Sequence, residues 1–206
     1  MKKLLFMLTV LATLFSLISC VDGAINLQKL DFYPAGNNSY VVSAGDAKYL
    51  DEIVIPKTYF GMPVVEIEKN GFKGCSRLES ITIPNGVTTI GSMAFDRCIS
   101  LKNVVIPNSV TSIGSYAFYG CTSLESIVIP NSVTRIEGSV FENCNSLESV
   151  VIPDSVTSIG ANAFYCYELR SIKYRGTEEQ WNSIDKHDRW IYSHYKYTVT
   201  YNYDGE

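Results

Sequence analysis

Residues 124–146 read LESIVIPNSVTRIEGSVFENCNS, and the segments 78–100, 101–123 and 147–168 repeat this pattern with few changes. Equivalent residues of neighbouring units are 23 positions apart. The spacing holds for three sets of residues: Pro84, Pro107, Pro130 and Pro153; Cys75, Cys98, Cys121 and Cys144; and Phe72, Phe95, Phe118, Phe141 and Phe164. A repeat of this length indicates a solenoid, in which every unit forms one coil and the coils stack.

The start of each unit alternates as a short strand does. In residues 124–130, Ile127 and Ile129 are predicted to face the core, whereas Ser126 and Val128 face outward. Pro130 then ends the strand, because proline has no N–H to donate to a neighbouring strand. The apolar positions therefore predict one buried and one exposed side for every strand.

The rest of the unit is expected to close the coil. Val133 and Ile136 predict a second extended piece that faces the core. The segment from Ala117 through Phe118 to Cys121 is expected to return the chain through a short helical turn. We therefore expect a leucine-rich-repeat solenoid with short parallel strands in each coil, little helix and a β cap at both ends.

The unit LxxIxIPxxVxxIGxxAFxxC resembles the BspA-like leucine-rich repeat family of bacterial surface lipoproteins. Residues 78–172 match this unit throughout, and residues 50–77 match it with an insert, IPKTYFGMPVVEI, that resembles the family's first repeat. The stretches YRGTEEQWNSI and TVTYNYDG resemble the ending that many members share. Members of the family include adhesins that engage host matrix proteins such as fibronectin and fibrinogen, so the resemblance implies a binding function.

The chain is expected to divide into four parts. Residues 1–20 are predicted to be a lipoprotein signal peptide, 21–49 an N-terminal β cap, 50–174 about five leucine-rich coils, and 175–206 a C-terminal helix–strand cap. The N-terminal cap is expected to be a hairpin broken around residues 34–38. In the C-terminal cap, Thr177 to Gln180 fits a capping box. The alternating tyrosines of residues 195–203 indicate a strand that either closes the solenoid or forms an aromatic binding platform.

The first 20 residues have the pattern of an export signal. Lys2 and Lys3 precede an apolar stretch that is too short for a comfortable membrane span. The stretch ends in LISC, which resembles a bacterial lipobox and implies that Cys20 carries the lipid. The alternative is ordinary secretory cleavage, with Cys20 incidental. Lipidation predicts an exported protein held at the outer membrane or the cell surface, although a periplasm-facing anchor stays open.

The other cysteines are predicted to be small buried residues. Cys75, Cys98, Cys121, Cys144 and Cys166 fall at equivalent positions of successive coils, so they form a linear ladder. Such a ladder does not converge on a metal as four zinc ligands do. Parallel Cβ vectors about 4.8 Å apart also exceed the usual disulfide separation. We therefore expect neither disulfides nor a metal site here.

Few residues are candidates for catalysis. His187 and His194 are the two histidines. A pair formed by Cys166 and His187, or a metal bound by His187 with Asp185 and Asp188, is possible by residue type, but a core cysteine and a solvated loop are the simpler interpretations. No catalytic residue and no cofactor are expected. The 17 basic and 21 acidic residues give a net charge of −4, which argues against nucleic acid as a partner.

The outward positions of the strands are the candidate ligand-binding surface. They are Ser80, Thr82, Asn103, Val105, Ser126, Val128, Ser149 and Val151. A row of exposed valines is typical of a partner contact. Alternatively, these β-branched residues simply support the sheet. The first hypothesis is a lipid-anchored, adhesin-like module of the cell envelope that binds host or bacterial protein or glycan, including host extracellular matrix. The alternative is a periplasmic lipoprotein with a structural or scaffolding role.

Overall fold

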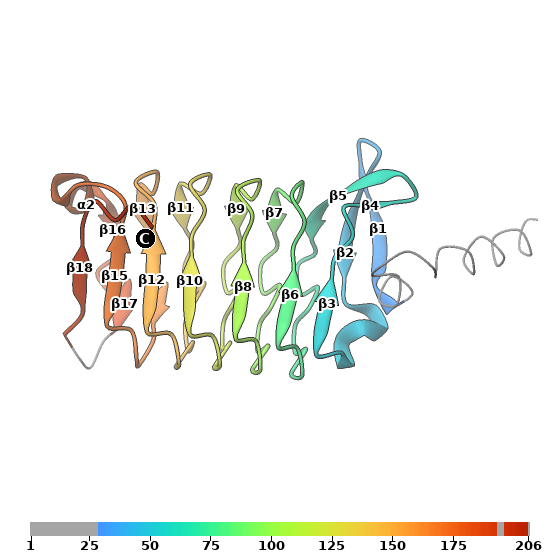
Figure 1. Cartoon of the computed structure of the whole chain (residues 1–206), viewed down its shortest axis with the longest axis horizontal. Coiled ribbons are helices and arrows are strands. Elements are labelled where there is room, and N and C mark those ends of the chain that lie inside the picture. The colour runs from blue at the N-terminus through green and yellow to red at the C-terminus, as the bar shows by residue number, and fades with distance from the viewer. Residues whose placement is uncertain (1–28, 193–195, 206) are drawn as a thin grey trace, which may run out of the picture.

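Seven strands lie side by side along one side of the molecule in the computed structural model, which describes residues 29–192 and 196–205 (Figure 1). We call this the front sheet; it consists of β3 (Glu52–Val54), β6 (Ser80–Thr82), β8 (Asn103–Val105), β10 (Ser126–Val128), β12 (Ser149–Ile152), β15 (Ser171–Tyr174) and β18 (Thr198–Thr200). Its registered pairs are all parallel. The fold is therefore the expected leucine-rich-repeat solenoid. The expected number of about five coils was too low, because β15 and β18 extend the front sheet beyond the regular units.

A second row of strands forms the next side of each coil. We call it the second sheet; it consists of β5 (Met62–Ile67), β7 (Thr89–Ile90), β9 (Ser112–Ile113), β11 (Arg135–Ile136), β13 (Ser158–Ile159) and β16 (Asp185–Lys186). Ile136 is buried and Arg135 is exposed, as the period-2 pattern predicts. Between the two sheets, serine side chains join neighbouring coils: Ser109 Oγ donates to Val87 O at 2.7 Å, and Ser155 Oγ donates to Val133 O at 2.8 Å.

The third side, which we call the turn face, is a ladder of turns rather than the expected short helical turn. Asp96 N donates to Met93 O three residues earlier, whereas Phe95 N donates at 2.7 Å to Ala117 O of the next coil. Alternate amides therefore close a turn or join two coils. The backbone has positive φ at two places in most units: Asn70, Met93, Tyr116, Ser139 and Asn162, and then Gly74, Arg97, Gly120 and Asn143. At the last regular coil, β14 (Phe164–Tyr165) pairs with β17 (Ile191–Tyr192).

The core is a continuous column of apolar side chains inside the coils. Phe72, Phe95, Phe118, Phe141 and Phe164 are fully buried and stack face to face, with ring centroids 5.1–5.5 Å apart. Trp190 ends the stack, because its ring meets Phe164 edge-on at 6.2 Å. The column is buried only because each coil covers the next.

The two ends of the solenoid carry different structures. At the N-terminal end, β1 (Asp31–Gly36) pairs antiparallel with β2 (Ser39–Ser43), and β2 continues the second sheet beside β5. The 3-10 helix η2 (Gly45–Tyr49) follows, and the insert IPKTYFGMPVVEI contains the hairpin of β4 (Thr58–Tyr59) with β5. At the other end, α2 (Glu178–Ser183) begins at the predicted capping box and buries Trp181.

One boundary between coils lacks the regular pairing. The front sheet divides into β3–β6–β8 and β10–β12–β15–β18, and the second sheet divides at the same coil, between β9 and β11. A Cβ placed on Gly114 would lie 2.5 Å from Ser92 N, which is too close for two non-bonded atoms. At this position the backbone of one coil therefore packs directly against the backbone of the preceding coil. Glu137 occupies the same position in the coil after the break. Among the regular units of residues 78–168, Glu137 is the residue that adds a Cβ at this position.

Candidate ligand-binding face

The outward positions of the front sheet form two parallel rows. Ser80 is in register with Asn103, and Ser126 is in register with Ser149, which gives a row of hydroxyl and amide groups. The second row, two residues further along each strand, contains Thr82, Val105, Val128 and Val151. Neighbouring strands are about 4.8 Å apart, so seven strands make a face on the order of 30 Å long.

The valines of this face differ greatly in exposure. The exposed fraction is 80% for Val105, 48% for Val128 and 46% for Val54, but only 9% for Val151. The prediction that Val151 faces solvent was therefore wrong. Val151 lies in register between Val128 and the long side chain of Lys173, so its neighbours cover it on both sides. Val105, in contrast, borders the break between β8 and β10.

Charged side chains border the polar row on the side where the strands begin. Lys102 Nζ lies 2.7 Å from Glu79 Oε2, and this hydrogen bond and the carboxylate charge raise the pKa of Lys102. Arg77 pairs with Asp51 at 3.0 Å in the preceding coil. Both pairs are exposed, so they contribute little to stability, but they give the face a charged border of both signs.

The cysteine ladder is buried, as predicted. All five cysteines of the described residues are free thiols with no exposed surface. Cys98, Cys121, Cys144 and Cys166 each donate to the carbonyl of a phenylalanine in the preceding coil, with Sγ–O distances of 3.0–3.2 Å. Burial raises the pKa of the Cys144 and Cys166 thiols, so they stay protonated and are poor nucleophiles.

His187 is not part of a recognisable catalytic or metal site among the described residues. His187 is exposed, and its Nδ1 accepts a hydrogen bond from Arg189 N at 3.2 Å. His194 lies outside the described residues. Among the residues that the structure describes, no cluster of three or more histidine, cysteine or acidic side chains is arranged to hold a metal.

The C-terminal aromatic residues pack against the end of the solenoid. Tyr197, Val199 and Tyr201 are partly buried on the core, and the Tyr197 ring meets Trp190 at 6.0 Å. This packing supports the interpretation of the segment as a cap, while Tyr195 lies outside the described residues. The observed strand is shorter than the tyrosine pattern predicts, because β18 contains three residues.

The sequence reasoning missed the tyrosines of the turn face. Tyr116 and Tyr119 lie on the same turn with ring centroids 5.8 Å apart, and Tyr165 and Tyr167 contact one another two coils further on. The signal was present in the repeat itself. At the position of Tyr119 and Tyr165, other units carry Lys73, Asp96 and Glu142.

Comparison with known proteins places the repeat in a family. Residues 65–186 match the BspA type leucine rich repeat region in six copies. This chain belongs to that family. A leucine rich repeat protein of T. pallidum is 34% identical with a TM-score of 0.67, and the match covers 71% of this chain and 69% of that one. No curated protein matches the chain.

Two further solved structures share the fold. A leucine rich cell surface protein of Faecalibacterium prausnitzii is 32% identical with a TM-score of 0.71; the match covers 78% of this chain and 41% of that one. The pneumococcal vaccine antigen PcpA has a TM-score of 0.61 at 19% identity, covering 84% of this chain and 44% of that one, which shows the fold alone. This BspA-type chain is thus similar to a bacterial cell-surface protein. Within the described residues, no helix is both long and apolar enough to cross a bilayer.

Proposed function

We propose that this chain is a binding module of the bacterial cell envelope, anchored by lipid at Cys20 and engaging a protein or glycan ligand through the front sheet. The observation that carries the proposal is the array of exposed side chains on neighbouring strands of the front sheet, in which Val105 and Val128 are the most apolar part of a polar, charged face. Exposed apolar groups with a polar border are typical of partner contacts.

The ligand-binding residues are proposed to be those of the two outward rows. Asn103, Val105, Ser126 and Val128 form the centre, because they lie on adjoining strands and are exposed. Ser80 and Thr82 extend the surface on one side. Ser149 contributes on the other side, whereas Val151 is covered by its neighbours and serves to support the sheet.

The test is binding of the protein to an array of matrix proteins, mucins and glycans, followed by substitution of the face. Val105→Asp and Val128→Asp should weaken a saturable interaction by about tenfold or more, because each places an unpaired charge in the contact. Thr111→Asp, on the exposed surface beside the second sheet, is the matched control and should leave binding unchanged. Undiminished binding by folded variants of Val105 and Val128 would contradict the assignment of this face.

The proposed function also predicts on which side of the outer membrane the module lies. A surface-exposed module should be cut when protease is added to intact cells, whereas a periplasmic scaffold should be cut only after the outer membrane is opened. Protection in intact cells, together with a blank ligand array, would contradict the adhesin-like role and favour a scaffold with a partner in the same envelope.

A further inference from the structure

The turn face carries four tyrosines that the solenoid does not need for its core. We call Tyr116, Tyr119, Tyr165 and Tyr167 the turn-face tyrosines. Tyr116 and Tyr167 are 40% and 43% exposed, and Tyr119 and Tyr165 are partly buried. Since other coils carry lysine, aspartate or glutamate at the position of Tyr119 and Tyr165, the fold does not require an aromatic ring there.

Tyr116 is held in a backbone conformation that disfavours it. Its φ is +62°, in the left-handed region, where Asn70 and Asn162 occupy the same position of other coils. Asparagine tolerates this region, whereas a bulky side chain there costs about 1 kcal/mol or more. An exposed residue that lowers stability and adds nothing to the core indicates a role outside the core.

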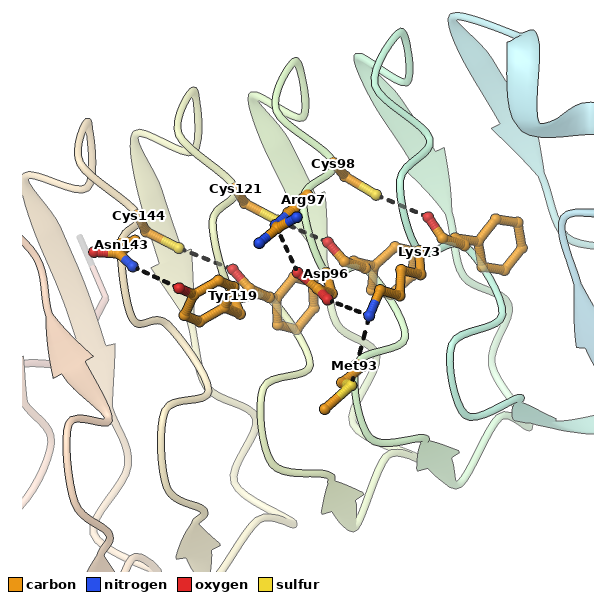
Figure 2. Close-up of polar contacts among 12 residues, drawn as sticks. Lys73, Met93, Asp96, Arg97, Cys98, Tyr119, Cys121, Asn143 and Cys144 are labelled. Atoms are coloured by element: carbon orange, nitrogen blue, oxygen red, sulfur yellow. Dashed lines mark hydrogen bonds and ion pairs between the residues drawn. The ribbon is translucent and has the colours of Figure 1, made fainter.

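Hydrogen-bonding groups hold and flank the rings. Asn143 Nδ2 donates to the Tyr119 hydroxyl at 3.0 Å, and this fixes the orientation of the ring (Figure 2). Tyr119 occupies the same position of the unit as Asp96 in the preceding coil and Glu142 in the next, so carboxylates flank its coil on both sides. Aromatic faces and carboxylate or amide acceptors therefore alternate along this side.

Asp96 contains an unused acceptor. Its side chain is 9% exposed, and Oδ2 pairs with Lys73 Nζ at 2.9 Å (Figure 2). Oδ1 is buried and accepts no hydrogen bond from the described residues, with Arg97 Nε 3.9 Å away. A buried acceptor without a donor costs about 1–3 kcal/mol. A ligand hydroxyl that displaces the exposed Arg97 side chain would supply the missing donor.

We infer that the turn face binds an extended oligosaccharide of β-1,4-linked pyranose rings. The negative faces of the tyrosine rings suit the C–H bonds on the flat side of a sugar, and its hydroxyls are donors for Asp96 and Glu142. Successive coils are 5.1–5.5 Å apart at the phenylalanine stack, a step comparable to the length of one pyranose ring. A protein partner would require a more continuous apolar centre than these separated rings provide.

The experiment is calorimetric titration of the full chain with chitohexaose and with cellohexaose. At least one should give saturable binding, and Tyr116→Asn and Tyr119→Glu should each weaken it by about tenfold, the value of one lost ring contact. Both substitutions introduce residues that this repeat already accepts at the same position, Asn162 and Glu142, so the variants are expected to fold. Tyr116→Asn should also raise the melting temperature, because it removes the strain of a tyrosine in the left-handed backbone region.

The control is Thr111→Ser, on the exposed surface beside the second sheet, which should leave oligosaccharide binding unchanged. The inference is independent of the proposed front-face ligand, so either can fail alone. Absence of saturable binding to both oligosaccharides would overturn it. Full affinity in Tyr116→Asn and Tyr119→Glu, or loss of affinity in Thr111→Ser, would equally overturn the assignment to the turn face.

Discussion

Single residues in this solenoid act mainly through the coil before or after their own. The serines of the turns after Pro107, Pro130 and Pro153 each donate to a backbone carbonyl 22 residues earlier, as Ser109 does to Val87. Each buried thiol from Cys98 to Cys166 likewise donates to a phenylalanine carbonyl of the preceding coil. The repeated serines and cysteines therefore hold the stack together by contacts between units.

The buried thiols predict that stability falls at alkaline pH. The pKa of Cys144 and Cys166 is raised in the folded protein, whereas unfolded thiols ionise near pH 8.5. Above that pH the unfolded state loses protons that the folded state keeps, so the free energy of unfolding decreases as pH rises. The expected slope approaches about 1.4 kcal/mol per thiol for each pH unit. Urea unfolding under reducing conditions at pH 8 and at higher pH measures it.

The control for this prediction is a double variant, Cys144→Ser with Cys166→Ser. Serine keeps a donor for the carbonyls of Phe118 and Phe141 and does not ionise in this range. Its stability should decline less with pH than that of the wild type. The same pH dependence in both proteins would show that the thiols do not produce the effect.

At the scale of the elements, the decisive feature is the contact between neighbouring coils. Gly91 N, Gly114 N and Gly160 N donate to Ile67, Ile90 and Ile136 of the preceding coil at 2.8–2.9 Å. Within the described chain, no such bond joins Glu137 N to Ile113 O. Both sheets divide between these same two coils. We expect the extra Cβ of Glu137 to keep this pairing from forming.

Glu137→Gly is expected to restore this pairing. The amides of residues 135–137 should then exchange with solvent about fivefold more slowly, since one hydrogen bond contributes about 1 kcal/mol. Hydrogen exchange followed by mass spectrometry measures this change. Glu137→Ala keeps a Cβ and is the matched control, so it should exchange as the wild type does. Equal protection in the two variants would mean that the side-chain charge, and not the Cβ, opens the boundary.

For the whole molecule, the solenoid presents different chemistry on different sides. The front sheet presents exposed valines bordered by ion pairs, and the turn face presents tyrosines beside carboxylates. The resemblance of residues 17–20 to a lipobox predicts that both sides are displayed from a membrane anchor.

Cys20→Ser should release the protein from the membrane. Wild-type protein is expected in the membrane fraction and labelled by an alkyne fatty acid, because the lipid on Cys20 supplies the membrane affinity. The variant should lose both the label and the membrane association. Cys75→Ser, at a buried cysteine, is the control and should behave as the wild type. A variant of Cys20 that remains labelled and membrane-bound would contradict lipidation at this residue.

The sequence alone determined the features that repeat. The 23-residue period, the buried isoleucines at 127 and 129, the buried cysteines and the capping box at Thr177 were all predicted and are present. These features can be predicted because each depends on residues close together in the chain, either on the alternation of apolar and polar residues or on a capping box. The family resemblance added the binding hypothesis, whereas the alternation of the strand residues pointed to the front sheet as its candidate surface.

The tertiary structure decided everything that depends on a residue's neighbours in adjacent coils. Val105 and Val151 occupy the same position of the unit, yet one is exposed and the other is buried, because their flanking strands differ. The count of coils also depended on β18, whose sequence departs from the repeat. The left-handed Tyr116 and the unused acceptor of Asp96 emerge only from backbone and side-chain geometry. A periodic sequence specifies one coil well, but the contacts between coils decide which of its side chains remain available to a ligand.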